Sequence, residues 1–141
     1  MDDLFPIKIE NAQAMIAFGE QIAESLKAGD VVALVGDLGA GKTHITQGIA
    51  KKLGYLAEVT SPTFALVNEY VAAKPELIHF DLYRLEQAEE LLEIGWEEYL
   101  ERDAVLVVEW ADRFPELMPA GTICIHIEHV EGGRELFYSK I

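Results

Sequence analysis

The sequence has few basic side chains for the number of acidic ones. Among its 141 residues, 11 are Lys or Arg and 25 are Asp or Glu, so the formal net charge is −14. Tight binding to a nucleic-acid backbone normally requires clustered Lys and Arg, and here only Lys51 and Lys52 adjoin one another. We therefore expect no direct high-affinity binding to nucleic acid. The acidity instead favours solubility or a basic protein partner.

Cysteine and long apolar runs are scarce as well. Cys124 is the only cysteine, which excludes an intrachain disulfide or a Cys-based metal cage, and its apolar surroundings predict a buried thiol. No apolar run approaches the roughly 20 residues of a membrane-spanning helix. The acidic start, Met1-Asp2-Asp3-Leu4, does not resemble a signal peptide. We expect a cytoplasmic protein without membrane contact, forming a single domain over residues 1–141.

The most informative segment is a glycine-rich turn between an apolar run and a helix-forming segment. Val31–Val35 leads into G-x-x-x-x-G-K-T, and His44–Leu53 follows. This spacing and context are typical of a phosphate-binding P-loop. Glycines let the backbone curl around an anion, and the helix N-terminus adds a favourable dipole. We predict a nucleotide site in which Lys42 reaches the β- and γ-phosphates and Thr43 ligates Mg²⁺. The loop positions predicted to bind the nucleotide are Gly36, Asp37, Leu38, Gly39, Ala40, Gly41, Lys42, Thr43 and His44. For His44 a helix-surface position is the alternative.

Hydrophobic periodicity predicts strands and helices along the whole chain, with a parallel core and flanking β-hairpins. The acidic helices over Glu86–Asp103 present either a solvated face or a docking face for a basic partner. The expected elements are a strand over Leu4–Ile9, a helix over Ala12–Lys27 capped by Asn11, a strand over Val31–Val35, a helix to Leu53 stopped by Gly54, strands over Ala65–Val71 and Leu77–Asp81, two short helices broken near Gly95, a buried strand over Ala104–Glu109, a turn or helix over Trp110–Leu117, and a hairpin of Thr122–His129 with Arg134–Ser139.

Two carboxylates end predicted strands and could serve the nucleotide. Glu109 ends the continuous apolar run, so we assign it to the metal ion. Asp81 ends a strand that His79 interrupts, and we assign it to orienting or activating water near the γ-phosphate. Surface carboxylates at strand ends are the alternative for both. With Lys42, these are the predicted catalytic residues.

Two further features have more than one interpretation. In the loop Thr60–Phe64, the hydroxyl of Thr63 or Ser61 could sense the γ-phosphate, as switch loops do, or the loop could be an ordinary proline turn. Trp110 could belong to the core or could be an exposed aromatic anchor for a partner.

The P-loop alone leaves several activities open. No Asn-Lys-x-Asp segment of a GTPase is present, and scattered arginines do not favour the Arg-rich lid of a small-metabolite kinase. Elimination therefore favours a small ATPase whose hydrolysis serves a partner. A P-loop metabolite kinase and a nucleotide-dependent binding module remain as alternatives.

Four segments in order strengthen this interpretation. The P-loop is followed by Thr60-Ser61-Pro62-Thr63-Phe64, His79-Phe80-Asp81-Leu82-Tyr83-Arg84-Leu85 and Val108-Glu109-Trp110. Together they resemble the TsaE (YjeE) family of bacterial ATPases over nearly the whole chain. The resemblance implies an α/β fold, namely a P-loop NTPase three-layer α/β/α sandwich with a mixed, mainly parallel sheet and β-hairpin additions. It implies binding of ATP or ADP with Mg²⁺. It also implies support of the TsaB–TsaD pair in forming N6-threonylcarbamoyladenosine beside the tRNA anticodon, with hydrolysis resetting the complex and tRNA contacted only indirectly.

The resemblance also assigns residues. Lys42 and Thr43 match the Walker A pair, Asp81 and Glu109 match the acidic positions of the family, and Trp110 matches a tryptophan near the partner surface. The segment Ser61–Phe64 matches a switch-like loop, and Asn11 and Arg134 match positions at the edge of the nucleotide. His44 replaces the Thr that is common after Lys-Thr in the family, a difference that concerns only a local contact.

Overall fold

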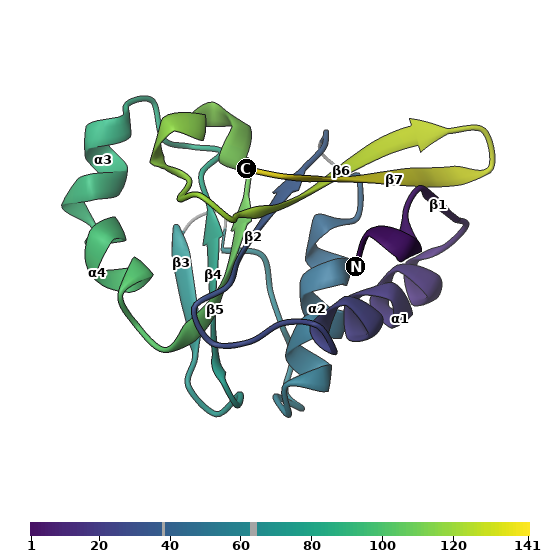
Figure 1. Cartoon of the computed structure of the whole chain (residues 1–141), viewed down its shortest axis with the longest axis horizontal. Helices are drawn as coiled ribbons and strands as arrows, with labels where there is room; N and C mark the ends of the chain where they lie inside the picture. The colour runs from purple at the N-terminus through teal and green to yellow at the C-terminus, as the bar shows by residue number, and fades with distance from the viewer. Residues whose placement is uncertain (38, 63–64) are drawn as a thin grey trace.

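A seven-stranded mixed sheet divides the molecule into two layers of helices (Figure 1). The computed structural model describes residues 1–37, 39–62 and 65–141. The strand order is β1-β7-β6-β2-β5-β4-β3, in which β6, β2, β5 and β4 run parallel. The strands are β1 (Ile7–Ile9), β2 (Val31–Val35), β3 (Val67–Tyr70), β4 (Glu76–Asp81), β5 (Ala104–Glu109), β6 (Ile123–Val130) and β7 (Gly133–Lys140). The α-helices are α1 (Ala12–Ala23), α2 (Lys42–Lys52), α3 (Ala88–Glu93) and α4 (Trp96–Leu100).

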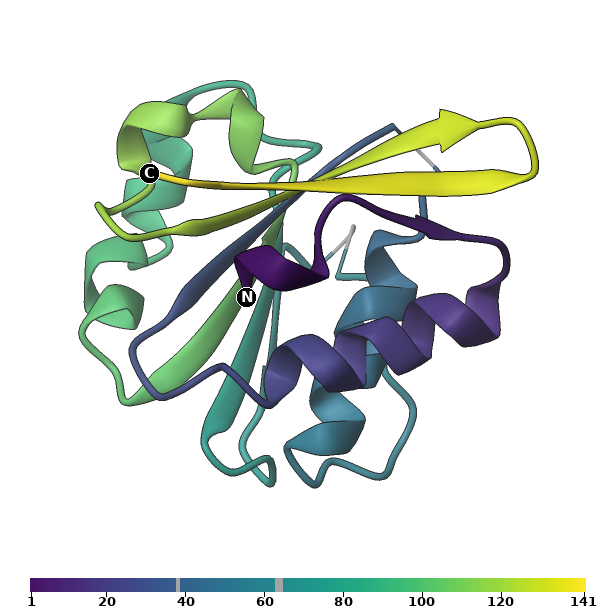
Figure 2. The ribbon, with the colours of Figure 1, turned by 45° about the vertical axis from the view of Figure 1, so that its right-hand side comes forward.

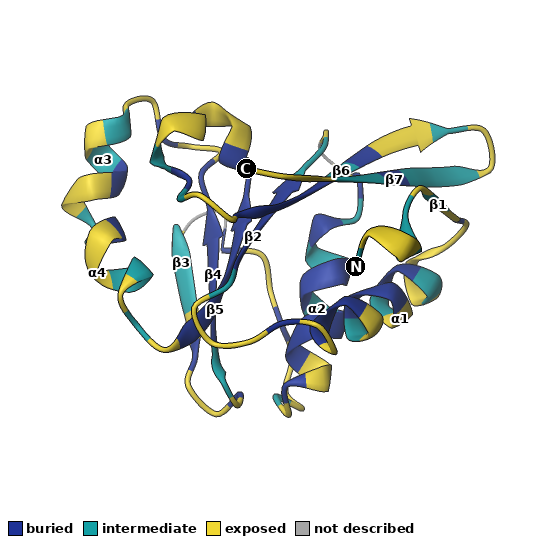
Figure 3. Ribbon diagram, viewed as in Figure 1, coloured by how far each residue is buried: buried dark blue, intermediate teal, exposed yellow. Residues whose placement is uncertain are grey.

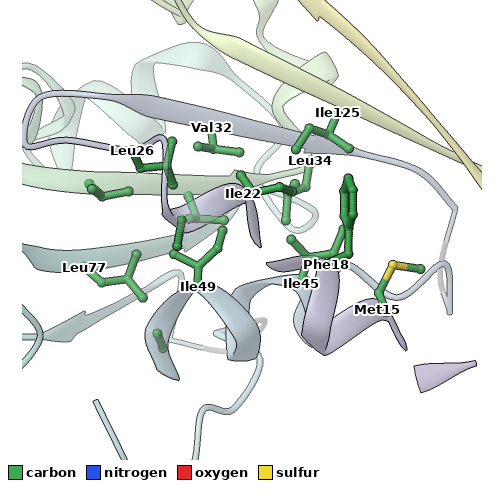
Figure 4. Close-up of a cluster of buried hydrophobic side chains, with 14 of the residues drawn as sticks. Met15, Phe18, Ile22, Leu26, Val32, Leu34, Ile45, Ile49, Leu77 and Ile125 are labelled. Atoms are coloured by element: carbon green, nitrogen blue, oxygen red, sulfur yellow. The ribbon is translucent and has the colours of Figure 1, made fainter. Parts of the chain in front are cut away.

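The central strands are buried on both faces, as Figure 3 shows for β2 and β5. Side chains alternate along β2, so Val32 and Leu34 join the core under α1 and α2, while Val31 and Ala33 join the core under α3 and α4. The first of these cores includes Ile22 and is drawn in Figure 4. The continuous apolar runs of the sequence are therefore explained by helices on both faces of a parallel sheet.

Helices α1 and α2 pack against each other unusually closely, and they lie side by side in Figures 1 and 2. A Cβ atom on Gly48 of α2 would lie 2.0 Å from the carbonyl oxygen of Ile16, and one on Gly19 of α1 would lie 2.2 Å from that of Ile45. Two facing glycines thus bring the helix backbones into direct contact. This contact fixes α2, whose first residues carry the predicted Lys-Thr pair, relative to α1.

Antiparallel strands complete the sheet at both edges. Strand β3 pairs with β4, with Asn68 opposite His79, and β7 pairs with both β6 and β1. The predicted hairpins, the buried strand Ala104–Glu109 and the helix break at Gly95 are confirmed, as are the Asn11 cap and the buried Cys124. The α/β fold with a mixed, mainly parallel sheet is confirmed too.

Several elements are shorter than the sequence predicted. Helix α1 ends at Ala23 rather than Lys27, because the Asp30 carboxylate accepts the backbone N–H of Lys27 at 2.9 Å and closes a turn. Strand β3 begins at Val67 because Leu66 has a φ of 70°, which no strand residue adopts. The first strand is shortened by a 3₁₀ turn over Asp2–Leu4, and the segment after β5 forms two 3₁₀ turns, Ala111–Arg113 and Pro115–Leu117.

Over residues 1–37, 39–62 and 65–141, each helix is too short or too polar to cross a bilayer.

Candidate nucleotide site

Three neighbouring parallel strands, β2, β5 and β4, have their carboxyl ends on the same side of the sheet. This arrangement brings the predicted site residues together. In the strand register, Leu34 of β2 lies beside Glu109 of β5, and Glu109 lies beside Asp81 of β4. The glycine-rich loop leaves β2 on this same side and returns into α2. Two carboxylates from distant parts of the sequence therefore meet the loop because the carboxyl ends of parallel strands coincide.

The loop has the backbone conformation that its glycines allow. Gly39 and Gly41 have φ values of 77° and 105°, and Gly41 caps the N-terminus of α2. Residues other than glycine rarely adopt these φ values. Lys42 and Thr43 therefore occupy the first turn of α2, where free backbone N–H groups and the helix dipole favour an anion.

A cavity of about 220 Å³ lies where these elements meet. The functional side chains around it are those of Lys42, Thr43, His44, Ser61, Asp81, Glu109 and Trp110, together with the loop residues Gly39, Ala40 and Gly41. Most of the positions predicted to handle phosphate and metal thus face one space. Leu38, Thr63 and Phe64 lie outside the described residues.

Lys42 is held against the loop that precedes it. Its Nζ donates to the carbonyl oxygen of Gly36 at 2.5 Å and to that of Asp37 at 3.0 Å. The same ammonium lies 4.3 Å from the centroid of the Trp110 ring. Burial lowers the pKa of Lys42 below its ordinary value of 10.5, and the nearby carboxylates, Glu109 foremost, oppose that shift. The lysine is therefore a nearly buried cation that phosphate oxygens could draw away from two carbonyls.

Glu109 is buried and contacts two side chains from other elements. It is 4% exposed, and its Oε2 lies 3.5 Å from the Thr43 hydroxyl, which can donate to it. The same oxygen lies 2.5 Å from Nε2 of His79, whose side chain is fully buried. Sequence reasoning treated His79 only as an interruption of the strand and missed this contact. The available signal was its position two residues before Asp81, which places both side chains on one face of β4.

Asp81 is buried and oriented by the backbone that follows it. It is 3% exposed, and its Oδ1 accepts the backbone N–H of Tyr83 at 2.9 Å. The carboxylate lies on the wall of the same cavity as Lys42 and Glu109. The alternative of an exposed carboxylate at a strand end is wrong for both Asp81 and Glu109.

A second cavity of about 160 Å³ is also lined by the loop, and the residues predicted at the nucleotide's edge line it too. Asn11, Arg134 and His44 line it together with Gly39 and Met15. Arg134 donates to the carbonyl oxygen of Gly39 at 3.0 Å, so the terminal hairpin is tied to the loop. Asn11 has a structural task too, because its Oδ1 accepts the backbone N–H of Ala14 and caps α1.

Trp110 packs against the core under α3 and α4, while its role as an anchor for a partner stays a prediction. It is half-buried, and its φ of 60° is rare for a residue with a side chain. Its ring lies 4.9 Å from that of Tyr83 and against the Lys42 ammonium. This tryptophan therefore connects the loop to the residues that follow both acidic strand ends.

The side chains present suit a magnesium ion that is held jointly with phosphates. In the described part of the chain, no group of three or more His, Cys, Asp or Glu side chains gathers as a metal cage. Thr43 and Glu109 offer hard oxygen donors 3.5 Å apart at the cavity. Mg²⁺ is usually held in this way, by one or two protein oxygens plus substrate phosphates and water.

The strand–loop–helix unit and the two strand-end carboxylates lie at one end of a mixed sheet with helices on both faces, which defines an α/β protein. Comparison with known proteins then gives the family. The family described as "Threonylcarbamoyl adenosine biosynthesis protein TsaE" matches residues 9–136. The chain belongs to this TsaE family.

Individual members of this family are similar to the chain along most of their length. The tRNA threonylcarbamoyladenosine biosynthesis protein TsaE of Haemophilus influenzae is 37% identical over 128 residues, which cover 87% of this chain and 81% of that protein. The protein of the same name from Bacillus subtilis is 37% identical over 132 residues, covering 93% and 82%. The crystal structure of YdiB from Bacillus subtilis superposes with a TM-score of 0.82 at 32% identity, covering 97% of this chain and 85% of that one.

Proposed function

We propose that this chain is a Mg²⁺-dependent ATPase that supports the TsaB–TsaD pair in forming N6-threonylcarbamoyladenosine next to the tRNA anticodon. Family membership supports the place in threonylcarbamoyladenosine biosynthesis. The observation that carries the ATPase activity is the convergence of Lys42, Thr43, Asp81 and Glu109 on one cavity beside the loop. ATP binding and hydrolysis would reset the complex between turnovers.

Each side chain then has a task that follows from its position. The Lys42 ammonium leaves the carbonyls of Gly36 and Asp37 to neutralise charge on the β- and γ-phosphates. Thr43 and Glu109 would hold Mg²⁺, which would neutralise phosphate charge. Asp81, fixed by the N–H of Tyr83, orients or deprotonates the attacking water.

The second cavity is proposed to receive the rest of the nucleotide. Asn11 and Arg134 would lie at its edge, and the backbone of Gly39, to which Arg134 is bonded, would lie beside the phosphates. His44 lines both cavities, which favours a local contact with the nucleotide over a purely solvated helix position.

The charge of the chain supports action through protein partners rather than on RNA directly. The net charge of −14 opposes tight contact with a phosphate backbone. In this proposal TsaB–TsaD contacts the tRNA, and the chain contributes the binding and hydrolysis of ATP.

A reconstituted modification assay tests this function. Modified tRNA is counted over several turnovers with TsaB–TsaD alone, with the chain added, and with its Lys42→Ala or Asp81→Asn variant. We expect sustained turnover only with the unaltered chain. Equal turnover without the chain would contradict the proposal, and a phosphorylated small metabolite formed from ATP would favour a kinase.

A further inference from the structure

We propose that His79 is a positioning residue that aims the Glu109 carboxylate at Thr43 and thereby sets the affinity of the site for Mg²⁺. The inference rests on the proposed function, because it gives a buried imidazole a task within the metal side of that site. The residue lies on β4, and its side chain has no access to solvent. It is part of neither the glycine-rich loop nor the cavity wall.

The contact geometry carries the inference. One oxygen of Glu109, Oε2, lies 2.5 Å from His79 Nε2 and 3.5 Å from the Thr43 hydroxyl. The imidazole and the hydroxyl therefore approach the same carboxylate oxygen from two elements, β4 and α2. A carboxylate on a single strand end could rotate about its side-chain torsions, and a buried donor at this distance removes much of that freedom.

The other ring nitrogen indicates which tautomer is present. His79 Nδ1 is buried and has no hydrogen-bond partner among the described residues. A proton on Nδ1 would be a buried donor without an acceptor, which is costly. The proton therefore belongs on Nε2, where it is donated to Glu109. The imidazole is then a fixed donor to the carboxylate, with an unprotonated and buried Nδ1.

The neighbouring strands fix the backbone position of His79. His79 lies between Asn68 of β3 and Val107 of β5 in the strand register. Asn68 and Tyr70 both donate to the carbonyl oxygen of Thr60, at 3.3 and 3.4 Å, which ties β3 to the start of the loop Thr60–Phe64. The donor is thus supported by a sheet rather than by a mobile loop, as positioning residues at metal sites commonly are.

The tautomer can be measured on the unaltered protein, and a variant is needed only to assign the signal of His79. Long-range ¹H–¹⁵N correlation spectra of the four histidine rings distinguish protonated from unprotonated nitrogens, and His79→Gln identifies the signal of His79. We expect a proton on Nε2 and none on Nδ1. A proton on Nδ1 alone would overturn the proposal.

Nucleotide affinity tests the link to Mg²⁺ with a readout other than activity. The dissociation constant of a fluorescent ATP analogue is measured once in the presence of Mg²⁺ and once in EDTA. The dissociation constant in EDTA divided by that in Mg²⁺ measures the contribution of the metal. His79→Gln keeps an N–H near the position of Nε2, whereas His79→Asn is polar but too short to reach Glu109. We expect His79→Asn to reduce this ratio about tenfold or more, and His79→Gln to retain most of it.

A buried neighbour serves as the matched control. Leu77→Val trims a fully buried side chain two residues earlier on the same face of β4, away from the cavity wall, and should leave the ratio unchanged. If His79→Asn and His79→Gln both keep the unaltered ratio, or both lose it equally, His79 does not position Glu109. If the unaltered chain binds no nucleotide, or binds it equally with EDTA, the proposed function itself fails and takes this inference with it.

Discussion

The ammonium of Lys42 lies 4.3 Å from the centroid of the Trp110 ring, so the lysine that we propose to bind phosphate and the tryptophan that follows Glu109 are in direct contact. Such a cation–π contact contributes on the order of 1 kcal/mol when partly shielded from water. The same ammonium donates to two carbonyls of the glycine-rich loop. Any ligand that draws Lys42 away must therefore change the surroundings of Trp110.

This relationship makes Trp110 a reporter of nucleotide binding. In a Trp96→Phe background Trp110 is the only remaining tryptophan, and its emission should change on addition of Mg²⁺·ATP because the neighbouring ammonium moves. The matched Trp110→Phe variant, which retains the fully buried Trp96, should show no change. Constant Trp110 emission under conditions where calorimetry records saturation would contradict the expected movement of Lys42.

The two acidic residues should separate by function. Glu109→Gln should raise the Mg²⁺ concentration needed for hydrolysis, because it removes charge from a proposed metal ligand. Asp81→Asn should lower the rate of hydrolysis by about 10²-fold or more at saturating Mg²⁺, because it removes the proposed base. Steady-state rates over a Mg²⁺ series measure both effects. Unchanged Mg²⁺ dependence in Glu109→Gln would refute its assignment to the metal.

The contact between α1 and α2 should be sensitive to a single methyl group. Alanine favours a helix over glycine by about 1 kcal/mol, yet a Cβ at Gly48 would lie 2.0 Å from the Ile16 carbonyl oxygen. We expect Gly48→Ala to lower the free energy of unfolding by about 1–3 kcal/mol or more. Lys52→Ala on the exposed end of the same helix should change it by about 0.5 kcal/mol or less. Urea unfolding decides, and a stabilised Gly48→Ala would show that the helices separate easily.

An ion-pair network between Arg102, which follows α4, and strands β3 and β4 should give a pH-dependent contribution to stability. The Arg102 guanidinium lies 2.7 Å from Glu69 and 2.9 Å from Glu76, and its hydrogen bond holds the pKa of Glu69 below the ordinary 4.5. Glu69 therefore contributes stability above pH 4.5, and this is lost as the pH falls towards its lower folded pKa. Because these groups are exposed, the contribution is about 0.5–1 kcal/mol.

The measurement is the difference in unfolding free energy between the unaltered chain and Glu69→Gln. This difference should be present at pH 6 to 7 and should shrink as the pH is lowered through 4.5. Glu58→Gln, at a carboxylate for which no such pair is present among the described contacts, provides the comparison. A difference between the chain and Glu69→Gln that stays constant down to pH 3 would contradict the pairing.

Much of this architecture was predictable because its signals are local. The run Ala104–Glu109 predicts a strand buried on both faces, and β5 is fully buried. The glycines in the sequence predicted the position of the loop, the end of α2 and the start of α4. Asp81 and Glu109 could be predicted because each ends a strand, and the carboxyl ends of neighbouring parallel strands lie together.

What escaped prediction depends on contacts between distant segments. The pairing of His79 with Glu109 joins side chains 30 residues apart, and an isolated histidine in an apolar strand does not reveal its partner. The end of α1 depends on the Asp30 side chain in the following turn, not on helix periodicity, which continues to Leu26. The contact of Lys42 with Trp110 likewise arises only once β2 and β5 are adjacent.

ATP hydrolysis by the purified chain, measured alone and with TsaB–TsaD, tests the central claim most directly, with Lys42→Ala as the blank. Removing a charged hydrogen-bond donor to phosphate should weaken ATP binding at least tenfold, so the blank should be inactive at moderate ATP concentrations. We predict slow hydrolysis by the chain alone and faster hydrolysis when the partners are added. Hydrolysis that ignores TsaB–TsaD, or that persists in Lys42→Ala, would contradict this account.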